Sequence, residues 1–121
     1  MATRRDLGWC YANGEGVPQD FQEAVKWYRK AAEQGHADAQ NNLGNRYYKG
    51  DGVMRNLVEA YKWFSLASAQ GNEIAKKNVQ MCRSHRWMGV AYSMTPDQIA
   101  EAEKLTREFK PQKESAASNS K

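Results

Sequence analysis

Cys82 and His85 are the residues whose types and spacing point most directly to chemistry. They stand three positions apart, so on a helix they would share a face, where a thiolate and an imidazole can hold a metal ion or form a nucleophile pair. A structural zinc needs four ligands, and the neighbouring sequence supplies no others. A nucleophile pair also needs an orienting group and an oxyanion site, and no such constellation is visible. We therefore predict no catalytic, metal or cofactor site.

The glycine-rich segment at residues 14–16 raises a second chemical hypothesis, a loop that cradles phosphate. Such a loop needs a strand before it and a Lys followed by Ser or Thr after it. Neither is present, and the same glycine pattern returns at residues 50–52. We interpret both segments as tight turns, in which glycine supplies the backbone conformation.

An internal repeat with a period of 36 residues organises the chain. Residues 7–42 align with residues 43–78 without a gap, and 15 of the 36 positions are identical, which chance alignment does not produce. A fixed period of this size is typical of a solenoid, in which similar units stack on one another. The positions that match between the two units are then expected to be those that the fold requires.

Each unit is predicted to contain two helices joined by the glycine turn. Asp20 can cap the second helix, Glu23 completes a capping box three residues later, and Gly35 can end the helix. The second unit repeats this pattern with Asn56, Glu59 and Gly71. Gly8 and Gly44 fall inside the two first helices, where glycine is unfavourable, so we expect another helix to approach closely there.

These residues resemble the Sel1-like repeat family. The motif LGxxYxxGxGV is followed by a capped helix with Ala, Trp-Tyr or Trp-Phe, and then by Gln-Gly. The resemblance implies an all-α, right-handed α-α superhelix of helix-turn-helix repeats. It also implies a bacterial adaptor or scaffold without catalytic residues, in which the first helices line the concave side.

The pattern decays after the second unit. We predict one repeat domain over residues 1–110, with units at 7–42 and 43–78 and a degenerate third unit at 79–94. The apolar segment at residues 83–94 is expected to pack on the end of the stack, with contact to a partner as the alternative. A capping helix is predicted at residues 95–109, because Thr95, Pro96 and Gln98 form a helix start. The tail at residues 111–121 is expected to be disordered.

Cys10 and Cys82 lie two whole periods apart. Stacked units advance by roughly 10 Å each, so the two residues should be ~20 Å apart. A disulfide needs Cα atoms within about 7 Å, so we predict two free thiols. Free thiols favour the cytoplasm, as does the absence of a signal peptide from this sequence. A secreted or periplasmic location stays open if the chain is a fragment.

A partner is expected to bind where the two units differ, because matching positions serve the fold. We predict a strip along the first helices that is polar and basic with two aromatic residues and a methionine. The strip consists of Arg5, Trp9, Asn41, Asn45, Tyr48, Lys77 and Met81. Exposed Trp, Tyr and Arg usually carry the binding energy of an interface. Trp9 could instead cover the open N-terminal end of the stack, through which the protein could also self-associate.

The charge distribution leaves two further hypotheses. The net charge of +4 comes entirely from residues 76–121, and a basic region can serve a nucleic-acid-associated protein. Acidic residues interleave with the basic ones in this region, so nucleic acid is not favoured. Inhibition of an enzyme by docking is the other alternative. No apolar stretch is long enough to span a membrane.

Overall fold

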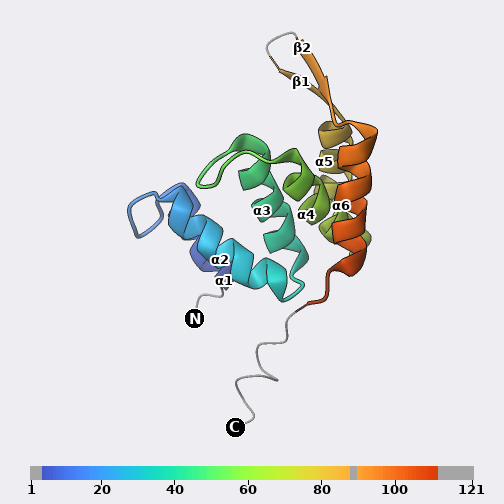
Figure 1. Cartoon of the computed structure of the whole chain (residues 1–121). Coiled ribbons are helices and arrows are strands. Elements are labelled where there is room, and N and C mark those ends of the chain that lie inside the picture. Colours follow the sequence, from blue (N-terminus) through green and yellow to red (C-terminus); the bar gives the residue numbers. More distant parts are fainter. Residues whose placement is uncertain (1–3, 88–89, 112–121) are drawn as a thin grey trace.

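The computed structural model describes residues 4–87 and 90–111, and the side chains of residues 7–83 and 94–111. This part of the chain contains helices and one β-hairpin, arranged in sequence along the molecule (Figure 1). The elements are α1 (Arg4–Asn13), α2 (Phe21–Glu33), α3 (Ala37–Lys49), α4 (Leu57–Ala69), α5 (Glu73–Arg83), β1 (Ser84–Trp87), β2 (Val90–Ser93) and α6 (Pro96–Glu108).

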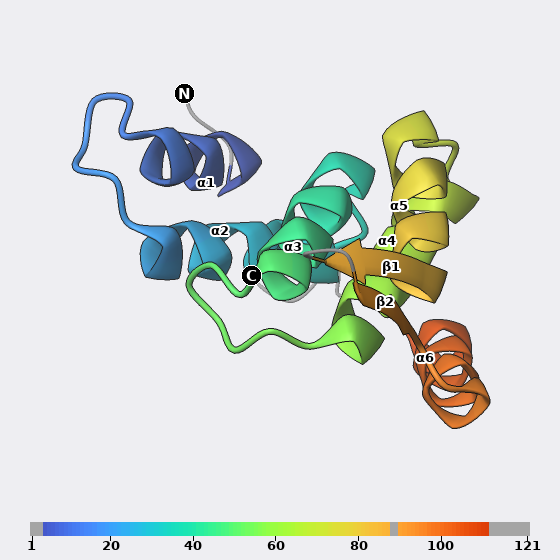
Figure 2. The same cartoon turned by 90° about the horizontal axis from the view of Figure 1, so that it is seen from above.

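Consecutive helices pack against one another, so the predicted all-α solenoid is confirmed. Seen from above, α1 and α2 form one end of the stack, α3 and α4 the middle, and α5 and α6 the other end (Figure 2). Of the predicted tail at residues 111–121, residues 112–121 lie outside the described residues.

Side-chain caps start the second helix of each unit. The Asp20 carboxylate accepts hydrogen bonds from the backbone of Gln22 and Glu23, and the Asn56 amide oxygen accepts one from Glu59. The Glu23 side chain pairs with Lys26, 3.1 Å away. The bonds to Asp20 and Asn56 satisfy backbone N–H groups that a helix start leaves without partners. The capping boxes predicted with Glu23 and Glu59 do not form, because the N–H groups of Asp20 and Asn56 donate to the carbonyls of Tyr11 and Tyr47 instead.

The interior glycines of α1 and α3 allow the close approach that the sequence predicted. A Cβ atom built on Gly8 would lie 2.6 Å from the ring of Tyr28, and one on Gly44 would lie 2.7 Å from the ring of Phe64. Real side chains do not approach so closely, so each aromatic ring occupies the space that the missing side chain leaves. Glycine thus sets the spacing of both helix pairs.

Two apolar clusters form the core. The first joins α2, α3 and α4 around Tyr28, Leu43 and Trp63. The second joins α4, α5 and α6 around Phe64 and Cys82. Both cysteines are unpaired, as predicted.

The helix α6 covers the end of the stack and packs mainly on α4. Thr95 and Gln98 form a complete capping box at its start, as the sequence predicted. Met94 and Ala102 are buried in the second cluster. After the helix, the ring of Phe109 meets Trp63 edge-on with 5.5 Å between the ring centroids. The end of the chain therefore returns to the first cluster.

A hairpin separates α5 from α6, and the sequence did not predict it. β1 and β2 pair antiparallel, with Ser84 opposite Ser93 and Trp87 opposite Val90. The strands contain Trp87, Val90 and Tyr92, residue types that favour strands over helices. Figure 1 shows the hairpin standing away from the helices, whereas we had expected this segment to pack on the end of the stack. Met94, which follows the hairpin, is buried in the second cluster.

None of the helices in the described residues is both long and apolar enough to cross a lipid bilayer.

Candidate functional site

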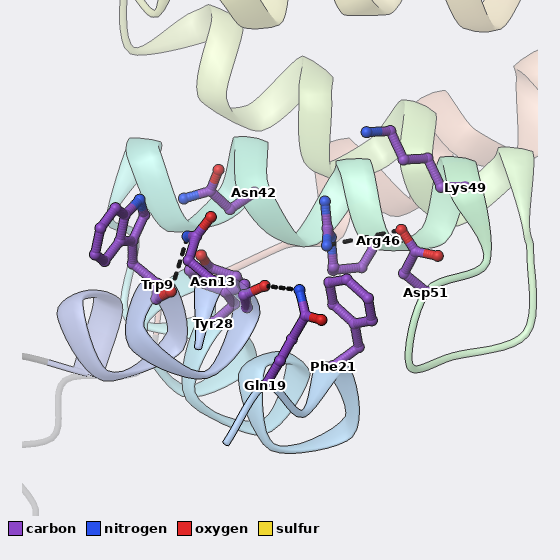
Figure 3. Close-up of a pocket in the computed structure, with 10 residues that line it drawn as sticks. Trp9, Asn13, Gln19, Phe21, Tyr28, Asn42, Arg46, Lys49 and Asp51 are labelled. Carbon is purple, nitrogen blue, oxygen red and sulfur yellow. Dashed lines mark hydrogen bonds and ion pairs between the residues drawn. The ribbon is translucent and has the colours of Figure 1, made fainter. Parts of the chain in front are cut away.

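A cleft with a volume of about 390 Å³ lies between the first helices of the two complete units (Figure 3). The last turns of α1 contribute Trp9, Ala12 and Asn13 to one wall. The side of α3 that faces α1 contributes the opposite wall. Cleft volumes of about 300–1,000 Å³ are typical of sites that hold small ligands or single side chains.

The opposite wall is polar and carries positive charge. Asn42, Arg46 and Lys49 line it at positions that fall on one face of α3. Asp51, which follows the helix, and Gln19, which precedes α2, stand at the edges of the cleft. The site therefore has one wall on α1 that carries an indole ring and a cationic wall on α3.

Phe21 and Tyr28 from α2 add aromatic rings to the cleft. Tyr28 is 3% exposed, because Gly8 lets α1 settle directly onto its ring. Burial raises the pKa of the Tyr28 hydroxyl, Arg46 lowers it to a lesser extent, and Cys10 raises it. The hydroxyl thus stays protonated and neutral at physiological pH.

Arg46 is the half-buried cation of the site. Its side chain is 15% exposed, and its guanidinium carbon lies 5.0 Å from the centre of the Phe21 ring. Its Nη1 atom is 3.7 Å from the carboxylate of Asp51. Its Nε atom is buried and has no hydrogen-bond partner among the described side chains and backbone. The aromatic ring contacts the guanidinium, and its Nε–H donor is unused.

Trp9 is the exposed anchor of the site. It is 51% exposed, although tryptophan normally buries most of its surface in a core. Its backbone carbonyl accepts a hydrogen bond from Asn13, and the carbonyl of Ala12 accepts one from Gln19. These two bonds fix the end of α1, so the wall that carries the indole is preorganised.

The structure brings few of the predicted strip residues into this cleft. Trp9 lines it, whereas Arg5 lies on α1 with a side chain outside the described ones. Asn41 is 7% exposed, and its side-chain oxygen accepts a hydrogen bond of 2.9 Å from Asn78. It joins α3 to α5 and faces away from solvent. A core polar residue of this kind holds helices together.

The other strip residues lie farther along the stack. Asn45 is half-buried on α3, and Tyr48 is half-buried with its ring 6.5 Å from that of Phe64. Lys77 and Met81 are exposed on α5. Among the strip side chains that the structure describes, Trp9, Lys77 and Met81 are exposed, and they lie on two helices, α1 and α5.

Asn42, Arg46 and Lys49, which line the cleft, each follow a residue of the predicted strip by one position. A shift of one residue turns a side chain by about 100° around the helix, so positions 41, 45 and 48 face a different neighbour. Asn42 matches Asn78 in the repeat alignment, so it falls among the positions expected to serve the fold. Arg46 and Lys49 correspond to Cys82 and His85. These two pairs do differ between units, and that difference was the available signal.

Comparison with known proteins places this geometry in a family. The model of the Sel1 repeat matches residues 4–36 and 37–72. The crystal structure of c5321, a protective antigen of uropathogenic Escherichia coli strains with an SLR fold, is 36% identical with a TM-score of 0.77. A Sel1 repeat protein from Oxalobacter formigenes is 43% identical with a TM-score of 0.62.

The two similar structures belong to longer chains. The match covers 88% of this chain and 21% of the Escherichia coli antigen, and 63% of this chain and 31% of the Oxalobacter formigenes protein. The chain therefore spans about a fifth and a third of these two proteins. A comparison with curated proteins finds no match. Proteins with Sel1 repeats are generally protein-interaction modules and typically non-catalytic scaffolds.

Proposed function

This chain belongs to the Sel1 repeat family, and from that premise we propose that it is a non-catalytic interaction module. It binds a peptide, or a segment of a protein surface, along its first helices. The binding is centred on the cleft between α1 and α3. Lys77 and Met81 on α5 extend the surface for a longer partner.

The cleft and its exposed indole carry this proposal. Trp9 is half exposed beside a preformed hollow of about 390 Å³ that also contains Arg46. Tryptophan and arginine are the residues that most often dominate the binding energy of an interface, above all next to a pocket. A preorganised wall lowers the entropic cost of binding. Both features favour recognition of one inserted side chain with flanking backbone.

Selection from a displayed library of random twelve-residue peptides against the immobilised chain tests the proposal. We expect enriched peptides to bind wild type saturably, and we expect Trp9→Ala to weaken them by about 2 kcal/mol, roughly thirtyfold. Met54→Ala is the matched control, since Met54 is an exposed apolar side chain that does not line the cleft. Met81→Ala measures how far the surface extends along α5.

Two results would contradict the proposal. One is equal affinity of the enriched peptides for wild type and for folded Trp9→Ala. The other is enrichment of no peptide at all, together with binding of nucleic acid that weakens steeply with salt. Circular dichroism of each variant establishes that a loss of binding is not a loss of folding.

A further inference from the structure

We infer that the α1–α3 cleft is selective for a carboxylate, so that the bound segment presents an acidic side chain or its C-terminal carboxyl group to Arg46. The inference rests on the proposed function and names the chemistry of the residue that enters the site. The shared ligand is a carboxylate with an apolar group beside it.

The unused donors of Arg46 are the first argument. A guanidinium has five N–H donors in a planar fork, and a charge-assisted bond to a carboxylate normally measures about 2.7–2.9 Å. The Arg46–Asp51 distance is 3.7 Å, and Nε has no partner among the described residues. The internal carboxylate therefore satisfies the guanidinium poorly. Because Nε is itself buried, a ligand carboxylate would bond to the terminal Nη atoms, which Asp51 approaches only to 3.7 Å.

The charge balance of the cleft is the second argument. Two cations, Arg46 and Lys49, line it against the single carboxylate of Asp51. Arg46 is largely shielded from water. In such a position the attraction between opposite charges is stronger than in bulk solvent. The Phe21 ring lies against the guanidinium, with 5.0 Å between the guanidinium carbon and the ring centre. The site is therefore complementary to an anion with planar, two-pronged geometry.

The apolar wall defines the rest of the ligand. Trp9 stands opposite the cationic wall, and Ala12 and the Tyr28 ring add to the apolar lining. A bare inorganic anion would leave the indole without a contact. A carboxylate attached to, or next to, an apolar side chain uses both walls (Figure 3).

The next junction of the solenoid lacks this chemistry. Cys82 is the counterpart of Arg46 in the next unit, 36 residues later. Cys82 is fully buried in the second cluster. Tyr48 stands where Ala12 stands and lies against Phe64. Carboxylate recognition is thus assigned to one junction, and a bound segment is anchored once.

Nuclear magnetic resonance titration of the full chain tests the inference with three small probes. They are N-acetyl-glutamic acid α-amide, which carries a side-chain carboxylate, N-acetyl-leucine, which has a free terminal carboxylate, and N-acetyl-glutamine α-amide, which is neutral. We expect saturable shifts of the Arg46 Nε–H signal and of the α3 amides with one or both carboxylates. The neutral probe should produce none. The stronger of the two carboxylates identifies the source of the ligand group.

Three variants sharpen the titration. Arg46→Gln should weaken carboxylate binding by about tenfold or more, since a hydrogen bond to a charged group is lost. Asp51→Asn removes the internal competitor and should tighten binding. Lys26→Gln also removes one positive charge, but from an exposed side chain outside the cleft, and should leave binding unchanged. If Arg46→Gln does not fold, the opposite effect expected of Asp51→Asn still decides.

Several results would overturn the inference. They are equal shifts with the neutral probe, shifts that survive in folded Arg46→Gln, and weaker carboxylate binding in Asp51→Asn. The proposed function fails separately. If selected peptides bind through Trp9 and keep their affinity when every Glu and Asp is changed to the amide and the C-terminus is amidated, then the interaction module stands and carboxylate selectivity falls.

Discussion

The α1–α3 and α3–α5 junctions have the same helix arrangement, but the first contains an open cleft and the second is filled by side chains. At the α1–α3 junction, Ala12 and Arg46 line an open cleft beneath which Tyr28 is packed. At the α3–α5 junction, the corresponding residues are Tyr48 and Cys82, which belong to or pack against an apolar cluster around Phe64. A larger ring at one position and a neutral thiol at the other fill the junction.

The polar residues between first helices show the same contrast. Asn78 donates a hydrogen bond to the buried Asn41 and so locks α5 onto α3. Its counterpart Asn42 lines the cleft between α3 and α1. An identical residue is therefore structural at one junction and available to a ligand at the other. A residue that is identical in two repeat units can therefore have different roles in them, so identity between units does not by itself separate structural residues from binding residues.

Exchange of Arg46 and Cys82 between the two junctions should show the largest difference in stability. Cys82→Arg places a charge without a partner in the second cluster and should destabilise the fold by about 3–5 kcal/mol. Arg46→Cys should cost only about 1 kcal/mol, the contribution of an aromatic–cation contact. Chemical denaturation followed by circular dichroism measures both. Equal costs for the two exchanges would show that the junctions are not different environments.

The paired asparagines offer a smaller and subtler contrast. Asn78→Ala leaves the Asn41 side chain buried without its donor and should destabilise the fold by about 1–3 kcal/mol. Asn42→Ala should change stability by about 0.5 kcal/mol or less, as for a surface position, and should weaken peptide binding instead. Denaturation and peptide titration of both variants provide the measurement. Strong destabilisation by Asn42→Ala would remove Asn42 from the ligand site.

The thiols should report the difference without any mutation. Burial raises the pKa of Cys82 to about 12, although Arg55 lowers it to a lesser extent. Only the thiolate reacts with alkylating reagents, so at pH 8 Cys82 should stay unmodified in the folded protein, whereas the half-buried Cys10 reacts. Mass spectrometry of tryptic peptides locates the label. Rapid modification of Cys82 in native protein would show that the second junction is open.

The same shift gives a pH dependence. The unfolded Cys82 thiol loses its proton near pH 8.5, whereas the folded one keeps it up to about pH 12. The folded state therefore binds more protons in this window, and stability should fall as the pH rises from about 9 to 12. Cys82→Ala should flatten this part of the curve. An unchanged slope in this variant would assign the pH dependence to other groups.

Much of the fold was predictable because the 36-residue period identifies the residues on which packing depends. Gly8 and Gly44 recur because Tyr28 and Phe64 need the space above them. The capping box at Thr95 was visible from a three-residue spacing. The hairpin at residues 84–93 was not, because one pair of short strands leaves no period in a sequence that is otherwise helical.

The cleft was predictable only in part. Trp9 was identified because its position varies between units, and an exposed tryptophan is unusual. Arg46 also varies between units, but it lies one position from the predicted strip and so on another face of α3. The local sequence does not fix which neighbour a helix face meets to within 100°, since packing against α1 and α5 decides it. Asn41 and Asn42 therefore exchanged roles.

The central claim is that binding belongs to the α1–α3 junction and not to the α3–α5 junction. The most direct test maps backbone and indole chemical shifts of the full chain while an enriched library peptide is added. The account predicts that the largest shifts fall on Trp9 and on residues 42–49 of α3, with smaller ones on α5. Shifts centred on Lys77, Met81 or the hairpin, with Trp9 unmoved, would contradict it.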